Sequence, residues 1–315
     1  MVAYFFSRIR VLILSLLFAS FMIFMMIEII PGDPASFMLG INAEADTIQA
    51  LKKELGLDVS KFHRYFDWIT GMIVGDFGVS YTYRVPVSEL VLSRLGVSIP
   101  LALYAIIVST IIALPVGLVA AANHGGFRDW SIMGFTQLGI AIPNFWFAMV
   151  LVLIFSIYLK WFSAGGVPGW EQGILLNLKA LTLPAFALAL PQASILARVL
   201  RSAIIDTLSQ DYFRTARSSG LTYFQTILKH SFRNALIPVL TIIGLQFSFL
   251  IAGAIIIENV FFLPGLGRLI FQGIVQRDLI VVESVVMLLV FAVVIVNFLV
   301  DMAYLAVDPR LRVKK

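Results

Sequence analysis

Six long apolar blocks set the first constraint on what this chain can fold into. A bilayer core of roughly 30 Å takes about 20 apolar residues in helical conformation. The blocks that meet this length are residues 11–30, 99–122, 132–159, 181–200, 235–257 and 280–307. Of the 315 residues, 60% are hydrophobic and only 13% are charged, which is not the balance of a soluble domain. We therefore expect an all-α polytopic membrane protein with six transmembrane helices.

The first block follows the basic residues Arg8 and Arg10 and ends at the sequence Pro-Gly-Asp-Pro of residues 31–34. A secretory signal peptide also begins with positive charge, but its apolar stretch is shorter and ends at a small-residue cleavage site. We therefore expect this block to be retained as a spanning helix.

The positions of lysine and arginine in the short loops predict the orientation in the membrane. With the N-terminus inside, one face collects Arg8, Arg10, Arg128, the stretch 198–233 and the basic C-terminal tail. Both termini are therefore predicted to be cytoplasmic. This orientation divides the chain into residues 1–30 (N-terminus and first helix), 31–98 (periplasmic segment), 99–307 (five-helix core) and 308–315 (cytoplasmic tail). The net charge of +5 needs no nucleic-acid partner, because cytoplasmic basic residues account for it.

Residue types that hold metals are scarce. The chain has no cysteine, so disulfides and thiolate metal sites are excluded. Its three histidines, His63, His124 and His230, are far apart in sequence, and the predicted topology puts His63 across the membrane from the other two. No metal site is expected.

The periplasmic segment is predicted to contain one short helix over residues 45–57. Asp46 can cap it, with Gln49 three residues later, and Gly56 is placed as its C-terminal stop. Aromatic residues follow, and they either pack this segment onto the membrane face, which we favour, or contact substrate: Phe62, Tyr65, Phe66, Trp68, Phe77, Tyr81 and Tyr83.

The predicted cytoplasmic stretch between the fourth and fifth spans is the most informative region. Its polar periodicity continues the fourth helix beyond the membrane to Arg217, and Gly220 is the residue type that most easily takes a left-handed conformation at a helix end. Thr222 can cap a second helix, with Gln225 in the capping-box position. That helix is predicted over residues 223–234, ahead of Pro238.

These elements form a predicted helical hairpin over residues 201–235, which we call the 201–235 hairpin. It carries apolar side chains, Tyr223, Phe224, Ile227 and Leu228, in a charged setting. Such groups fit either of two roles: they bind a partner surface, or they lie back on the bilayer interface as part of an ordinary loop.

Several motifs, taken together, carry a family resemblance. The sequence Asp-Tyr-Phe-Arg-Thr-Ala-Arg-Ser-Ser-Gly-Leu of residues 211–221, followed by His230 and by Arg-Asn-Ala-Leu-Ile-Pro at 233–238, resembles the cytoplasmic signature loop of ABC-importer permeases. The version that it resembles is that of the dipeptide/oligopeptide/nickel permease family. Further segments that are similar lie in the expected order along nearly the whole chain, at residues 31–34, 56–58, 75–80, 262–268 and 308–310.

One departure distinguishes branches of the family. The broad signature begins with glutamate and two alanines, whereas this chain has Arg214, Thr215 and Ala216 at those positions. The substitution is typical of the peptide branch. It weakens any inference about a docking carboxylate.

The resemblance implies the partners and the location. It implies a bacterial inner-membrane importer with a second homologous permease subunit as heterodimer partner, two cytoplasmic ABC ATPases and a periplasmic substrate-binding protein. ATP and Mg²⁺ would be held by the ATPases, because this chain has no G-x-x-x-x-G-K-[ST] phosphate loop and is not expected to be an enzyme. The 201–235 hairpin would contact an ATPase through residues that include Arg214, Thr215, Ala216, Gly220, Leu221, Tyr223, Phe224, His230, Arg233 and Asn234.

Polar residues within the spans are candidates for the translocation pathway, because such groups avoid lipid. Each of them can instead tie one helix to another. The candidates are Asn144, Gln246, Ser248, Glu258 and Asn259, with Gln137 and Gln192 as further polar positions. Gln246 and Glu258 are favoured because the fifth span borders the pathway in the family that the chain resembles. Near an interface, Glu258 could simply be hydrated.

The cargo implied is di- or oligopeptides, with nickel chelates, opines or oligosaccharides as alternatives within the family. Two other classes compete. A membrane-embedded hydrolase needs a nucleophile with a base or paired acids, whereas the one deep acid expected here, Asp301, is solitary. A stand-alone secondary transporter commonly shows an internal repeat, and none appears.

Overall fold

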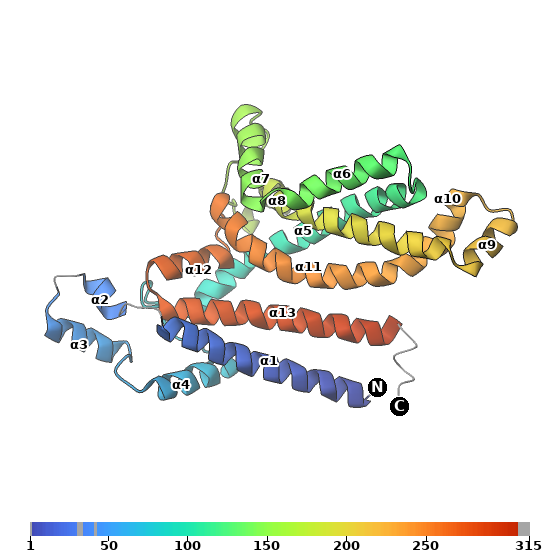
Figure 1. Ribbon diagram of the computed structural model, residues 1–315. Coiled ribbons are helices and arrows are strands. Elements are labelled where there is room, and N and C mark those ends of the chain that lie inside the picture. The colour runs from blue at the N-terminus through green and yellow to red at the C-terminus, as the bar shows by residue number, and fades with distance from the viewer. Residues whose placement is uncertain (1, 30–33, 41–42, 308–315) are drawn as a thin grey trace. The chain divides into compact units, whose positions relative to one another are not determined.

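The computed structural model describes residues 2–29, 34–40 and 43–307 (Figure 1). Over these residues the backbone is almost entirely helical, and the one strand-like pairing is an isolated bridge between Val79 and Pro86. The all-α prediction is confirmed. The chain divides into two compact units, Met1–Ser98 with Pro264–Met302 and Ile99–Leu263 with Ala303–Lys315. The predicted tail 308–315, the motif at 308–310 and positions 31–33 of the first motif lie outside the described residues.

Five helices in the described part of the chain are long and apolar enough to cross a bilayer. They correspond to the first, second, fourth, fifth and sixth predicted blocks. Their spanning stretches are Phe5–Ile29, Val87–Ala122, Ile174–Leu208, Pro238–Val260 and Leu279–Met302.

The third predicted block is not one straight helix. It consists of α6 (Phe127–Ala141) and a second helical stretch, Asn144–Tyr158, which begins with α7 (Asn144–Leu151), and the two are bent by 98°. The cause is Pro143, which caps α7, because the residue before a proline is pushed out of the helical region. Ile142 accordingly has ψ 124°. The sequence signal for this break was present, but the apolar run obscured it.

The first unit contains α1 (Val2–Ile29), α2 (Pro34–Leu39), α3 (Ala45–Glu54), α4 (Lys61–Val74), α12 (Leu266–Val275) and most of α13 (Leu279–Val307). Helix α4 folds back against α1 (Figure 1). Glu28 on α1 pairs with Lys61 at 3.1 Å and with Arg64 at 3.3 Å, and Tyr65 shares a hydrogen bond with Ser20.

The aromatic residues of this unit have two different environments. Trp68 is buried and Tyr65 partly buried in an apolar cluster with residues of α1 and α13. Phe62 and Phe66, by contrast, are exposed. Only part of the aromatic run therefore serves the core of this unit.

The prediction of a solitary Asp301 was wrong. Its carboxylate lies 3.2 Å from the guanidinium of Arg8, so α1 and α13 are joined by an ion pair.

The predicted cap of the short exterior helix was also wrong at one end. Helix α3 begins after Glu44, no side chain caps it, and Asp46 and Gln49 lie within the helix. Its other end agrees with the prediction. Gly56 has φ +67°, and the N–H of Leu57 donates to the carbonyl of Lys52, which closes a Schellman turn.

A buried acid organises the loop between α4 and α5 (Val87–Ala122). The Asp278 carboxylate accepts hydrogen bonds from the Ser80 hydroxyl at 2.5 Å and from the backbone N–H groups of Tyr81 and Thr82 at 3.1 and 3.0 Å. Burial raises the pKa of Tyr81 to about 12, so this phenol stays neutral at physiological pH. The buried acid thus fixes residues 80–82 to the segment between α12 and α13.

The second unit is built around α8 (Ile174–Leu208), against which α6, α7 and α11 (Phe232–Val260) pack. Glycine lets α5 approach closely, because a Cβ on Gly117 would lie 2.7 Å from the carbonyl oxygen of Ala197. Close packing of small residues is the usual way in which membrane helices associate. Proline is tolerated inside these helices at Pro115, Pro184, Pro191 and Pro238.

Candidate functional site

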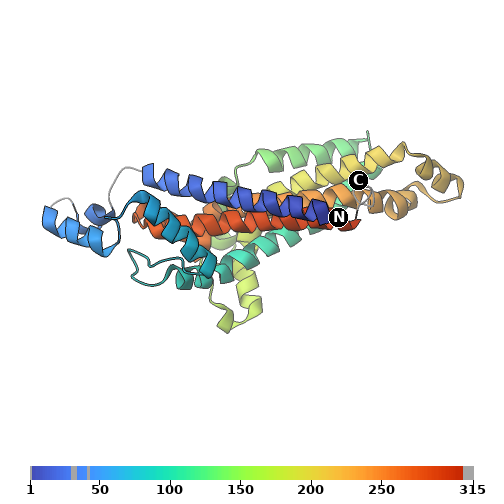
Figure 2. The same cartoon turned by 90° about the horizontal axis from the view of Figure 1, so that it is seen from below.

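The outer part of the 201–235 hairpin, residues 209–231, lies beyond the ends of α8 and α11 (Figures 1 and 2). Helix α8 ends at Leu208, and a separate helix, α9 (Asp211–Ser218), follows. The predicted continuation of the fourth helix to Arg217 was therefore wrong. Gln210 takes an extended conformation with ψ 148° and redirects the chain, which buries the side chain of Phe213.

The turn after α9 agrees with the prediction. Gly220 has φ +91°, a left-handed conformation that side-chain-bearing residues rarely adopt. A Cβ at this position would meet no atom within 4 Å, so any cost of substitution comes from the backbone alone. Arg217 reinforces the turn by donating to the carbonyl of Leu221 at 2.7 Å.

The second arm of the hairpin begins with the predicted capping box. The Thr222 hydroxyl accepts from the N–H of Gln225, and the Gln225 side chain accepts from the N–H of Thr222. Helix α10 (Tyr223–Thr226) then passes through a π-helical segment, Ile227–Ser231, directly into α11. The predicted helix end at Asn234 was wrong, because helical structure continues through Pro238. The hairpin is consequently continuous with a predicted span.

Buried apolar side chains anchor the hairpin to the rest of the second unit. Phe213 and Ile227 are buried in one cluster with Leu200 and Ile204 of α8 and with Ala121 at the end of α5. The rings of Phe213 and Tyr223 also meet edge-on, with centroids 5.8 Å apart, which joins the two arms. The hairpin is therefore fixed at its base by the same packing forces that hold the unit together.

The outer surface of the hairpin is apolar and basic. Phe224 is 50% exposed and Leu228 is 49% exposed, and Tyr212 and Tyr223 are exposed as well. Exposed basic residues lie on the same hairpin: Arg214, Arg217, Lys229 and Arg233. Exposed aromatic residues together with arginine are typical of protein-binding surfaces.

Most of the predicted ATPase-contacting residues lie on this surface, but not all. Thr215 and Asn234 are exposed, and Leu221 and His230 are half-buried. Ala216 is buried against the hairpin's own core, so it packs inward. Ile227, one of the apolar residues that the sequence assigned to the hairpin, is also fully buried.

The polar residues of the predicted spans do not form a single site. The structure brings Gln246 of α11 to α8, where its Nε2 donates to the carbonyl of Gln192 at 2.7 Å. The Oε1 atoms of both glutamines and the hydroxyl of Ser248 are buried without a hydrogen-bond partner. Such groups are costly to leave unpaired.

The other three candidates for the translocation pathway, Asn144, Glu258 and Asn259, lie in different environments. Asn259 donates to the carbonyl of Ile255 in its own helix at 2.7 Å. The Asn144 amide lies beside Gly253, where a Cβ would be 3.6 Å from its nitrogen. Glu258 is completely buried, so the expectation of a hydrated interfacial acid was wrong.

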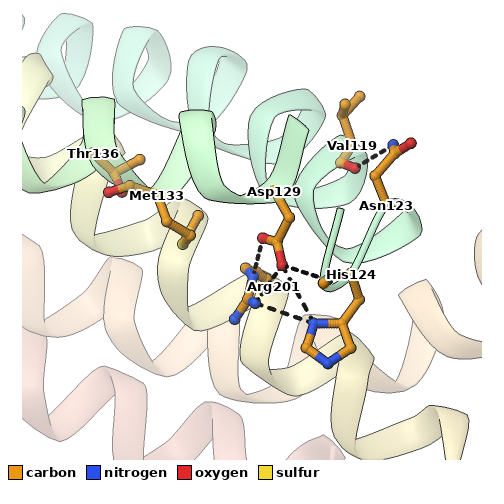
Figure 3. A network of polar contacts seen from close by, with 8 residues as sticks. Val119, Asn123, His124, Asp129, Met133, Thr136 and Arg201 are labelled. Carbon is orange, nitrogen blue, oxygen red and sulfur yellow. Dashed lines mark hydrogen bonds and ion pairs between the residues drawn. The ribbon is translucent and has the colours of Figure 1, made fainter. Parts of the chain in front are cut away.

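Sequence analysis missed one polar cluster, formed by Asp129, Arg201 and His124 (Figure 3). The Asp129 carboxylate accepts two hydrogen bonds from the Arg201 guanidinium, both at 2.6 Å, and one from the N–H of Gly125 at 3.0 Å. The only available signal was a lone acid at the start of an apolar block, and nothing in the sequence pairs it with a residue 72 positions away. Among the described residues, no group of three histidine, aspartate or glutamate side chains is arranged to hold a metal ion.

Two protein-family profiles match this chain. The profile described as "Binding-protein-dependent transport system inner membrane component" matches residues 113–313, and its N-terminal counterpart matches residues 1–102. A putative peptide transport system permease protein of Brucella abortus (strain 2308) is 40% identical over 312 residues, with 99% of each chain covered. The glutathione transport system permease protein GsiC of Escherichia coli (strain K12) is 35% identical over 314 residues, with 100% of each chain covered.

A solved structure has a similar fold. It is that of the MetNI methionine ABC transporter in inward-facing conformations, which matches with a TM-score of 0.59 at 18% identity. The match covers 70% of this chain and 97% of that one.

Proposed function

The chain belongs to the family of binding-protein-dependent transport system inner membrane components, and from this premise we propose that it imports peptides by the movement of its 201–235 hairpin. It is a multi-pass inner-membrane protein and the permease component of an ABC importer, not an enzyme. Such a component works with ATPase and substrate-binding partners.

The hairpin is the observation that carries the proposal. Its exposed Phe224 and Leu228, together with the exposed basic residues of the hairpin, are suited to an apolar groove with acidic edges on a cytoplasmic ATPase subunit. Arg214 occupies the position where the broad family signature has glutamate, so an acid is the expected partner on the ATPase. We propose that the hairpin and both termini lie on the cytoplasmic side, as the distribution of lysine and arginine predicts.

Transport would follow from ATP-dependent closure of two ATPase subunits, which hold the ATP and Mg²⁺. A conformational equilibrium shifts only if the partner binds the two states with different affinity. The hairpin meets the mechanical requirement, because it is anchored in the cluster around Leu200 and Ile227 and runs continuously into α11. Movement of the ATPase surface would therefore be passed to two spanning helices.

A peptide cargo is supported by the names of the two relatives that cover the whole chain. Nickel chelates, opines and oligosaccharides are the alternatives, and a separate periplasmic binding protein would select among them. We propose that a second, homologous permease subunit completes the pathway as a heterodimer partner.

Gln246 and Ser248 are the residues proposed to border this pathway. The support is that each keeps a buried polar atom without a partner, which peptide N–H and C=O groups can satisfy when the helices separate. Asn144, Glu258 and Asn259 are proposed for the same pathway because they lie on α7 and α11.

The test is peptide uptake by the complete complex reconstituted in proteoliposomes. ATP is supplied on the side of the membrane where the ATPase subunits lie, and peptide is supplied on the other side. Gly220→Val should leave ATP hydrolysis in place but abolish uptake, because valine cannot take the left-handed turn without strain. Gly56→Val is the matched control, since Gly56 also has positive φ and open space around it. Normal uptake by an assembled Gly220→Val complex would refute the proposed role of the hairpin.

A further inference from the structure

A charged cluster in the second unit lies at the base of the 201–235 hairpin, where Arg201 contacts Asp129. The Asp129 carboxylate is only 4% exposed and accepts hydrogen bonds from Nε and Nη2 of the Arg201 guanidinium and from the Gly125 N–H. Nδ1 of His124 lies 3.3 Å from the same carboxylate. Figure 3 shows the Arg201 and His124 side chains directed at this carboxylate from different elements. The cluster joins the start of α6 to α8 and to the turn after α5.

Two further contacts fasten α6 to α8 along the same face. Gln137 accepts a hydrogen bond from Arg198, and Gly139 packs so tightly on Ser194 that a Cβ would overlap the serine hydroxyl. From the start of α6 to its end, the partners on α8 come progressively earlier in the chain, from Arg201 through Arg198 to Ser194. The two helices are therefore antiparallel and joined at three points. Helix α6 has little freedom to slide along α8.

The same part of α8 carries the hairpin. Leu200 and Ile204, immediately before and one turn after Arg201, pack against Phe213 and Ile227 in the cluster at the base of the hairpin. Arg201 therefore lies where two attachments meet. Its helix holds the hairpin, and its side chain holds α6.

A buried ion pair contributes little net stability, because desolvation of both charges offsets their attraction. Its better-supported effect is to favour one arrangement over others. Arginine suits this task because its planar fork binds a carboxylate through two parallel bonds, which lysine cannot reproduce. The bidentate geometry at Asp129 thus specifies one register of α6 on α8.

We infer that Asp129 and Arg201 are positioning residues that make α6 move as one body with α8 and the 201–235 hairpin. This inference rests on the proposed function, in which the ATPase displaces the hairpin. The ion pair would transmit that displacement to α6. Unlike α8 and α11, α6 is not directly continuous with the hairpin in the chain. His124, 3.1 Å from an Arg201 nitrogen, closes the outer side of the cluster.

Distances between spin labels test the inference without reference to cargo. The natural chain has no cysteine, so labels can be placed at Gly134→Cys on α6 and Ser218→Cys on the hairpin, two exposed positions. Double electron–electron resonance is measured on the assembled complex in the nucleotide-free and in the ATP-trapped state. The distribution of distances between the two labels should be narrow and the same in both states. Asp129→Asn should broaden or shift it in the trapped state.

The functional readout is the amount of peptide imported per ATP hydrolysed. Asp129→Asn and Arg201→Lys should lower it by roughly two- to thirtyfold, the range for residues that link distant sites. Asp129→Glu, which keeps the charge, should recover part of the loss. Glu54→Gln, which breaks the exposed Glu54–Arg84 pair, is the matched control and should change neither readout.

Two results would overturn the inference. One is a label distance that already changes between the two states when Asp129 and Arg201 are intact. The other is an Asp129→Asn complex with native distances and native import per ATP. If Asp129→Asn does not assemble, Arg201→Lys decides by the same criteria. If the complex of the natural chain hydrolyses ATP but imports no peptide, the proposed cargo is contradicted instead, and the label distances still test the inference.

Discussion

The 201–235 hairpin and the buried interface of α8 with α11 satisfy their polar groups in opposite ways. In the hairpin, the capping box and the Arg217–Leu221 bond satisfy groups at the turn, and apolar side chains face outward. At the interface, apolar groups are packed, whereas Gln192 and Gln246 retain buried oxygens without partners. The hairpin thus presents exposed apolar groups, whereas the interface encloses unpaired polar ones.

The largest effect should be a difference in stability between substitutions at the base of the hairpin and on its outer surface. Ile227 is fully buried and Leu228, the next residue, is 49% exposed. Ile227→Ala should lower the free energy of unfolding by about 2–5 kcal/mol because it leaves a cavity in the anchoring cluster. Leu228→Ala should cost less than about 1 kcal/mol. Denaturant titration of the purified permease measures both, and equal losses would show that the base is not packed as described.

The next effect concerns the outer surface alone. Phe224→Ala should weaken ATPase binding roughly tenfold or more, as loss of an aromatic anchor at the centre of an interface does. Stability of the permease should hardly change, since Phe224 is half exposed. Titration of the ATPase subunit onto the permease in nanodiscs gives the dissociation constant. Phe66→Ala, a similarly exposed aromatic residue on α4, serves as control. A dissociation constant that Phe224→Ala leaves unchanged would remove the hairpin surface from the interface.

A smaller effect tests the other side of the comparison. Gln246→Leu removes a buried oxygen that has no partner, but it also removes the Nε2 hydrogen bond to the Gln192 carbonyl. The two effects oppose each other, so the free energy of unfolding should change by no more than about 1 kcal/mol. If that oxygen accepts from cargo during transport, the KM for peptide uptake should rise roughly two- to tenfold, as for one lost hydrogen bond. A native KM would mean that Gln246 serves only to tie α11 to α8.

The smallest effect is electrostatic. Arg214→Gln should weaken ATPase binding only a few-fold, because exposed ion pairs are worth about 0.2–1 kcal/mol. The dissociation constant of the variant should also depend less on salt concentration, since one screened attraction is gone. Identical salt curves for Arg214→Gln and the natural chain would place this side chain outside the interface.

Local signals in the sequence predicted the hairpin turn well. Gly220 and the Thr222–Gln225 pair act over a few residues, so their conformations could be read directly from residue types. Five spans were likewise evident from apolar length. The bend at Pro143 was missed because an apolar run hides a backbone restriction that a single residue imposes.

Long-range pairings could not be read in this way. Asp129 and Arg201 are separated by 72 positions, and Arg8 and Asp301 lie near opposite ends of the chain. The charge of a residue does not identify its partner, and of these four residues only Asp301 stood out in the sequence as an acid within a span. The burial of Ala216 depended on the break at Gln210, which no residue type announces strongly.

Labelling of a single cysteine tests the central claim most directly, because the natural chain has none. Ser218→Cys lies in the exposed turn of the hairpin, and His63→Cys lies in the segment proposed to be periplasmic. In intact cells, a membrane-impermeant maleimide should label position 63 but not position 218, and a short bifunctional reagent should join position 218 to the ATPase in inverted vesicles. Labelling of position 218 from outside the cell, with no crosslink to the ATPase, would contradict the account.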